Sequence, residues 1–186
     1  MLDLATYLPK LKEFEGCSPH MYLDTAGNVT VGVGQMLHSS AIAQTLPFAT
    51  ADGTPATADE IAAGFAAVKA CPTGMLYPAY RKYTSFDLPD SEIDKLTERT
   101  VAEVVNQIRV NFPDYDSYPG PACAAIFDMA YNLGLSGLEA KFPLCCEAIR
   151  EQDWATAAEE CERLGIQKSR NDWTEAQFAE AATTTT

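Results

Sequence analysis

Residues 13–37 read EFEGCSPHMYLDTAGNVTVGVGQML, where a helical pattern gives way to a β pattern. Apolar residues at helical spacing predict a helix over 3–14, with Asp3 as its N-cap and Gly16 ending it. The turn sequence Ala-Gly-Asn, followed by alternating valines, predicts a small antiparallel hairpin over 21–34. Glycines in the second strand predict a close backbone approach or a ligand there. This junction indicates an α+β fold.

The rest of the chain is predicted to be mostly α-helical. Residues 39–89 show little pattern beyond a capping box at 57–60, and we interpret them as an insertion or variable region. Residues 1–182 are expected to form one domain, and 183–186 a frayed tail or the start of a linker. Helices are predicted over 90–112, 121–133, 142–150 and 154–164, and from about 171 onward.

Composition excludes several classes of function. Thirteen basic against 26 acidic residues give a net charge of −13, which argues against binding nucleic acid or an anionic membrane through a basic surface. No apolar run approaches the roughly 20 residues of a membrane span. The N-terminal sequence lacks the pattern of a secretory signal, so synthesis in the cytoplasm without a signal peptide is expected. We expect a monomer without membrane insertion.

The cysteines and histidines do not predict a metal or a cofactor. The six cysteines include no Cys-x-x-Cys pair, and His20 and His38 lack partners at metal-ligand spacing. Buried apolar packing explains Cys123, Cys146 and Cys161, while disulfide pairing stays open.

Two carboxylates and a hydroxyl bracket the helix–hairpin junction. Asp24 follows Glu15 by nine residues, and Thr30 follows Asp24 by six. The helix dipole disfavours a charged carboxylate in the last turn, and Phe14 and Tyr22 are expected to shield Glu15 from water. Such a group suits a general acid, whereas Asp24 at an open turn would stay ionised. Two carboxyls in unlike environments are what glycosidic-bond cleavage uses, and a threonine hydroxyl can position the water.

Each of these residues also has a structural interpretation. An acid near a helix end is usually solvated, an aspartate before a turn usually caps it, and a threonine suits a strand. Only the combination favours a functional site.

This combination resembles the lysozymes of tailed phages, the glycoside hydrolase family 24 muramidases. Their signature of Glu-Gly, Tyr-x-Asp-x-x-Gly and Thr-x-Gly-x-Gly is matched by Glu15-Gly16, by 22–27 and by 30–34. AIFDMAYNLG and DWATAAEEC resemble two of the family's later helices. The resemblance implies a mostly helical α+β fold, with a small β-hairpin lobe and a helical lobe around a cleft.

The resemblance also implies an activity and a set of site residues. Glu15 would be the general acid, Asp24 the carboxylate that assists water, and Thr30 its positioning partner. The substrate would be peptidoglycan glycan strands, cut by inversion between N-acetylmuramic acid and N-acetylglucosamine. Inversion needs carboxyls about 6.5–9.5 Å apart. The positions expected to contact sugar are Met36, Tyr131 and Asn132, although core packing explains Met36 and Tyr131 equally well, and a helix C-terminal position explains Asn132.

Two alternatives stay open at this point. A lytic transglycosylase needs only the acid, and a silent peptidoglycan-binding module needs neither carboxylate. The charge of −13 would oppose an approach to an anionic wall, which favours delivery to the periplasm or cell wall as a phage endolysin or a type VI secretion effector. An effector would also imply an immunity protein as a partner.

Overall fold

The computed structural model describes the backbone of residues 4–184 and the side chains of 7–184. The chain forms two compact units. We call Leu8–Arg99 the β unit, and the residues up to Tyr7 together with those from Thr100 the helical unit. The boundaries fall within two helices, α1 (Leu4–Glu15) and α4 (Asp90–Asn111). None of the helices described is long and apolar enough to cross a membrane.

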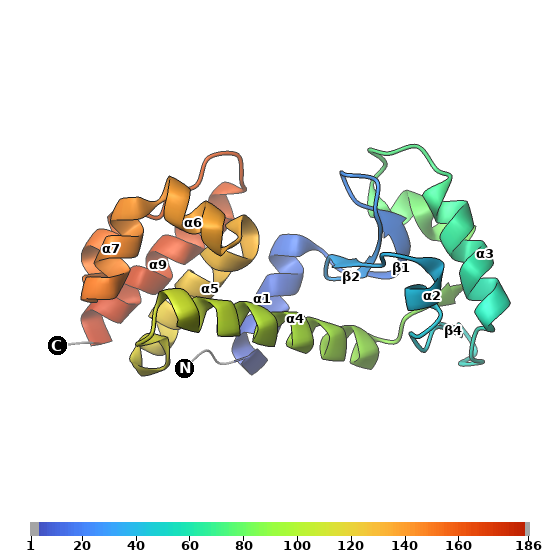
Figure 1. Cartoon of the computed structure of the whole chain (residues 1–186), viewed down its shortest axis with the longest axis horizontal. Coiled ribbons are helices and arrows are strands. Elements are labelled where there is room, and N and C mark those ends of the chain that lie inside the picture. The colour runs from blue at the N-terminus through green and yellow to red at the C-terminus, as the bar shows by residue number, and fades with distance from the viewer. Residues whose placement is uncertain (1–3, 185–186) are drawn as a thin grey trace. The chain divides into compact units, whose positions relative to one another are not determined.

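The β unit is built on a three-stranded antiparallel sheet in the order β1-β2-β3 (Figure 1). The strands are β1 (Ser18–Leu23), β2 (Val29–Gly32) and β3 (Gln35–Met36). The predicted helix ends at Glu15 and the predicted hairpin is present. However, β1 starts three residues earlier than expected, and β3 was not predicted because two residues carry no readable alternation.

The surroundings of Gly32 explain why a glycine occurs in this strand. Gly32 has φ +64, and a Cβ there would lie 3.2 Å from Cγ2 of Ile93 in α4. A close approach to the Gly32 backbone is therefore present, but the Ile93 side chain makes it, and not a ligand or another backbone segment.

Residues 39–89 form ordered structure that packs on the sheet. They contain α2 (Ser40–Ala43), β4 (Ala49–Thr50), α3 (Ala58–Lys69), the 3₁₀ helix η1 (Tyr77–Tyr83) and β5 (Phe86–Asp87). The predicted capping box at the start of α3 is confirmed. A Cβ on Gly64 would lie 2.8 Å from Phe86 and 3.4 Å from Met21 of β1, so α3 lies directly against the sheet core.

The helical unit is organised around α5 (Gly120–Leu133). Its residues from Ala122 to Ala130 are mostly buried, and it packs against α6 (Leu135–Lys141) and α9 (Lys168–Thr184) (Figure 1). The remaining elements are η2 (Tyr115–Ser117), α7 (Pro143–Glu151) and α8 (Trp154–Glu159).

Three helix predictions differ from the structure. Helix α6 was not predicted, because Gly134 was interpreted only as the end of α5. Gly134 has φ +69 and is both the C-cap of α5 and the N-cap of α6. Helix α8 ends at Glu159 instead of Leu164. Helix α9 continues through Thr184, and the last two residues of the predicted frayed tail, 185–186, lie outside the described residues. Asp3, the predicted N-cap of α1, lies outside the described residues.

The early end of α8 has a tertiary cause. The Arg163 guanidinium donates to Asp128 Oδ2 at 2.7 Å, and its backbone N–H donates to the side chain of Asn171. Arg170 pairs with Asp128 Oδ1 at 2.9 Å, and the Tyr7 and Thr174 hydroxyls also donate to Asp128. Asp128 is fully buried, so these partners compensate a charge that has left water.

We expect Asp128→Ala to lower the free energy of unfolding by about 3–5 kcal/mol, because it leaves two buried guanidinium groups without their anion. Thermal or denaturant unfolding monitored by circular dichroism measures this loss. Asp172→Ala is the matched control: it breaks the exposed pair with Lys168 and should cost under about 1 kcal/mol. Equal losses in the two variants would contradict the assigned role of Asp128.

Candidate active site

Glu15 is the last residue of α1 and lies two positions before β1 begins at Ser18. Gly16 follows with φ +75, a left-handed conformation that turns the chain from helix into strand. Phe14 is buried in the core whereas Glu15 is exposed. The expected shielding of Glu15 from water is therefore wrong, because the helix end turns Phe14 inward and leaves its neighbour facing solvent.

Asp24 lies in the turn between β1 and β2 and accepts three hydrogen bonds. Its Oδ1 accepts from the backbone N–H groups of Ala26 at 2.9 Å and Asn28 at 2.7 Å. Its Oδ2 accepts from the Asn28 side-chain Nδ2 at 3.0 Å. Burial raises the pKa of Asp24, but the bonds from Asn28 and from the turn backbone outweigh it and hold this pKa below its ordinary value. The carboxylate therefore stays ionised, as predicted.

Thr30 lies on β2 and is joined to the same asparagine. Its hydroxyl donates to the Asn28 carbonyl oxygen at 3.1 Å, and the residue is 2% exposed. Across the sheet, Thr30 is paired with Tyr22 on one side and with Met36 on the other. The β unit thus brings Asp24, Thr30 and Met36 together around one turn and one strand pair.

The pKa of Tyr22 is affected by both carboxylates. Burial raises its pKa to about 12, and the negative charges of Asp24 and Glu15 act in the same direction. Its phenol therefore keeps its proton at neutral pH and can donate a hydrogen bond within the field of both acids.

The other two predicted sugar contacts belong to the helical unit. Tyr131 and Asn132 lie in the last turn of α5 and are partly buried. The Tyr131 ring packs on Phe127 at a centroid distance of 5.6 Å, so core packing accounts for part of its surface.

A comparison with protein families matches the phage lysozyme model over residues 12–172. The chain belongs to the phage lysozyme family. It is a glycoside hydrolase of a family that degrades peptidoglycan, and the predicted mostly helical α+β fold is confirmed. No curated protein sequence matches the chain.

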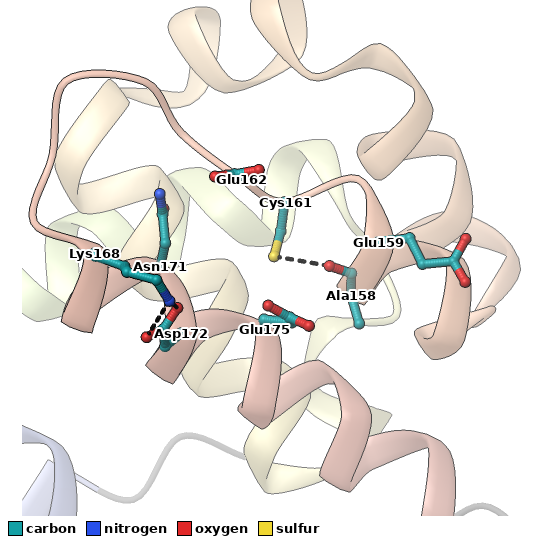
Figure 2. Close-up of a pocket in the computed structure, with 8 residues that line it drawn as sticks. All are labelled: Ala158, Glu159, Cys161, Glu162, Lys168, Asn171, Asp172 and Glu175. Atoms are coloured by element: carbon teal, nitrogen blue, oxygen red, sulfur yellow. Dashed lines mark hydrogen bonds and ion pairs between the residues drawn. The ribbon is translucent and has the colours of Figure 1, made fainter.

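The helical unit of this lysozyme also contains a hollow of about 290 Å³, and half of the residues that line it are acids. Lys168 pairs with Asp172 there, and Cys161 Sγ lies 3.2 Å from the Ala158 carbonyl oxygen (Figure 2). None of the predicted site residues lines it, and its charge does not suit an anionic wall polymer. The lining residues are Ala158, Glu159, Cys161, Glu162, Lys168, Asn171, Asp172 and Glu175.

Nothing in the described part of the lysozyme gathers three or more histidine, cysteine or acidic side chains that could hold a metal ion. All six cysteines are free thiols, and Cys123, Cys145, Cys146 and Cys161 are buried. Burial raises the pKa of the Cys161 thiol to about 11, so this thiol stays protonated as an apolar side chain.

The sequence analysis missed Asn28 as a site residue. Its backbone N–H, side-chain amide and carbonyl oxygen serve Asp24 and Thr30 together. The available signal was an asparagine at the end of a turn, between the two residues of interest in the sequence, but this position was interpreted only as part of the turn.

We expect Asn28→Ala to raise the pKa of Asp24 toward the usual 3.9 or so, because it removes the side-chain bond to Oδ2 and keeps both backbone bonds. A titration followed by the carboxyl ¹³C signal measures this directly. A pKa that is lowered in the folded state stabilises the fold above the unfolded value, and this contribution is lost as pH falls through the lowered value. Thr25→Ala, at an exposed turn position, is the control, and an unmoved pKa in Asn28→Ala would contradict the assignment.

Proposed function

We propose that this lysozyme is an inverting muramidase that cleaves the β-1,4 bond between N-acetylmuramic acid and N-acetylglucosamine. In this proposal Glu15 is the general acid, Asp24 the general base, and Thr30 the residue that positions water. The observation that carries it is the set of hydrogen bonds through which Asn28 holds both Asp24 and Thr30.

Counting lone pairs identifies the oxygen of Asp24 that would act as base. Each carboxylate oxygen accepts about two hydrogen bonds. Oδ1 already accepts two backbone N–H groups, whereas Oδ2 accepts only the Asn28 amide. Oδ2 therefore keeps a free acceptor site for one proton of a water molecule.

The same count defines what Thr30 can do. A hydroxyl has one proton and two lone pairs, and the Thr30 proton is given to the Asn28 carbonyl oxygen. Toward a water molecule, Thr30 Oγ1 can therefore act only as an acceptor. A water that donates one proton to Asp24 Oδ2 and the other to Thr30 Oγ1 has its lone pairs left to face the sugar carbon.

The reaction then balances in one displacement. The water oxygen bonds to the anomeric carbon of N-acetylmuramic acid as its bond to the glycosidic oxygen breaks. Asp24 takes a proton from the water, and Glu15 gives its proton to the leaving oxygen. The new hydroxyl lies on the face opposite the broken bond, so the first product is the α anomer. We propose that Met36, Tyr131 and Asn132 contact the sugars.

The charge of −13 supports a particular setting for this activity. An acidic enzyme is repelled at long range by walls rich in carboxylate or teichoic acid, so diffusion from outside would be slow. We propose delivery to the periplasm, as a phage endolysin or as the toxin domain of a secreted antibacterial effector.

We expect the wild type to release soluble muropeptides with hydrated reducing ends from purified peptidoglycan, detected by mass spectrometry. Glu15→Gln should lower the rate about 10²–10⁴-fold, because it removes the proton for the leaving oxygen. Glu13→Gln is the matched control, since it removes the same charge from an exposed position on the same helix and should keep the activity. Asp24→Asn should lose activity as well.

The products separate this proposal from its alternatives. Products one water lighter, with anhydro ends, would identify a lytic transglycosylase and leave Asp24 a structural role. A first-formed β anomer, observed by NMR, would contradict inversion. No product from the wild type, with retained binding to peptidoglycan, would indicate a binding module.

We expect lysis of Gram-positive walls to quicken as salt rises from about 10 to 150 mM, because the Debye length shrinks from about 30 to 8 Å and screens the repulsion. Turbidity clearance measures the rate. Hydrolysis of a short stem-free oligosaccharide of N-acetylglucosamine and N-acetylmuramic acid, which carries only a few carboxylates, is the control and should change much less with salt. Slower lysis at higher salt would overturn the charge argument.

A further inference from the structure

The 39–89 segment places η1 directly on the strand that follows Glu15. The packing of η1 on β1 includes a hydrogen bond from His20 Nε2 to the Tyr77 carbonyl oxygen, at 3.0 Å. Because a carbonyl only accepts, this ring nitrogen carries the proton. Further along the segment, the Leu88 N–H donates to the Pro19 carbonyl oxygen at 2.7 Å. Both bonds hold the segment against β1.

This attachment puts the Tyr77 ring beside the proposed catalytic residues. A Cβ built on Gly16 would lie 4.0 Å from Cε1 of Tyr77, and Gly16 directly follows Glu15. The Tyr77 ring centroid lies 6.2 Å from that of Tyr22, whose phenol is in the field of Asp24 and Glu15. The ring therefore lies next to chain segments that carry both carboxylates.

Packing alone does not account for the position of Tyr77. Its side chain is 43% exposed, whereas Tyr80, three residues later in η1, is fully buried and donates its hydroxyl proton to the Pro72 carbonyl oxygen. Pro78 is the second residue of η1 and restricts the backbone next to Tyr77. The fold thus anchors η1 through Tyr80 and presents Tyr77 to solvent from a fixed backbone.

An aromatic ring held in this way suits a carbohydrate. Tyrosine offers an apolar face for the C–H groups of a sugar ring and a hydroxyl for its polar substituents. A rigid aromatic side chain also loses little conformational entropy on binding. Since an uncharged contact is not weakened by charge repulsion, it suits a protein of charge −13 that binds an anionic polymer.

We propose that Tyr77, with Tyr22 beside it, forms an aromatic subsite that binds a sugar ring of the peptidoglycan glycan strand next to Glu15. The subsite binds the glycan and not the peptide stem. It gives the 39–89 segment a function in substrate binding, and it rests on the proposed muramidase activity.

Binding is tested first on the full chain carrying Glu15→Gln, so that the glycan is not cut. The probe is a soluble oligosaccharide of alternating N-acetylglucosamine and N-acetylmuramic acid without peptide stems, titrated by calorimetry. Adding Tyr77→Ala should weaken binding roughly tenfold, whereas Tyr77→Phe, which keeps the ring, should stay within about threefold. Leu76→Ala is the matched control, since it truncates an adjacent, 81% exposed apolar side chain and should change nothing.

Kinetics on an otherwise unaltered chain give a second readout. Tyr77→Ala should raise KM by a similar factor and leave kcat at saturating glycan unchanged, because the contact is made equally in the ground state and the transition state. In the Glu15→Gln chain without further substitution, the Tyr77 ring signals in an NMR spectrum should shift as the oligosaccharide is added, which tests the contact even if Tyr77→Ala does not fold.

The outcomes distinguish the two proposals. If the wild-type chain releases no muropeptides, the proposed function is overturned. An active wild type whose Tyr77→Ala variant keeps normal binding and KM, or whose Tyr77 signals do not shift, overturns the subsite alone. An equal loss in Tyr77→Phe and Tyr77→Ala, accompanied by a lower melting temperature, would assign the ring to packing and likewise overturn it.

Discussion

The turn between β1 and β2 is held by hydrogen bonds that run in both directions between Asp24 and Asn28. The Asp24 N–H donates to the Asn28 carbonyl oxygen at 2.9 Å, and the Asn28 N–H donates to Asp24 Oδ1 at 2.7 Å. The strands that leave this turn, β1 and β2, set Tyr22 opposite Thr30, and the next pair, β2 and β3, sets Thr30 opposite Met36. If this turn opened, the sheet would lose its register and the site its geometry together.

In the proposed mechanism, one carboxylate has both a structural role and a catalytic role. As a turn cap, Asp24 satisfies backbone donors through Oδ1, and these bonds keep it ionised. The cap leaves Oδ2 with a free acceptor site, which a base requires. Under the proposed mechanism, the two interpretations of Asp24 therefore do not compete, because the bonds that stabilise the turn also keep the carboxylate ionised.

The helical unit contains a buried charge that must be compensated. A fully buried aspartate is stable there only because two arginines, a tyrosine and a threonine surround it. One of those arginines comes from the loop after α8, so satisfying the charge takes precedence over continuing the helix. Local helix propensity gives way to the cost of leaving a buried ion without partners.

Much of this protein could be predicted from sequence because the governing interactions are local. The helical pattern predicted the end of α1 near Glu15, the turn residues predicted the hairpin, and the capping box predicted the start of α3. The spacing of Glu15, Asp24 and Thr30 indicated the phage lysozyme family, which the comparison with protein families shows. Each of these features depends on residues within a few positions of one another. However, the sequence did not show which side of the end of α1 faces the core. The exposure of Glu15 to solvent was therefore not predicted.

Contacts between distant residues could be found only in the tertiary structure. His20 and Tyr77 are 57 positions apart, and no periodicity indicates that a weakly patterned segment returns to β1. Asp128 likewise finds its arginines 35 and 42 positions away. Such contacts form because apolar faces must be buried and buried charges must be paired. In the sequence, many residues look equally suitable as partners. Only the folded chain selects among them, because each choice must fit all the others in the same packed volume.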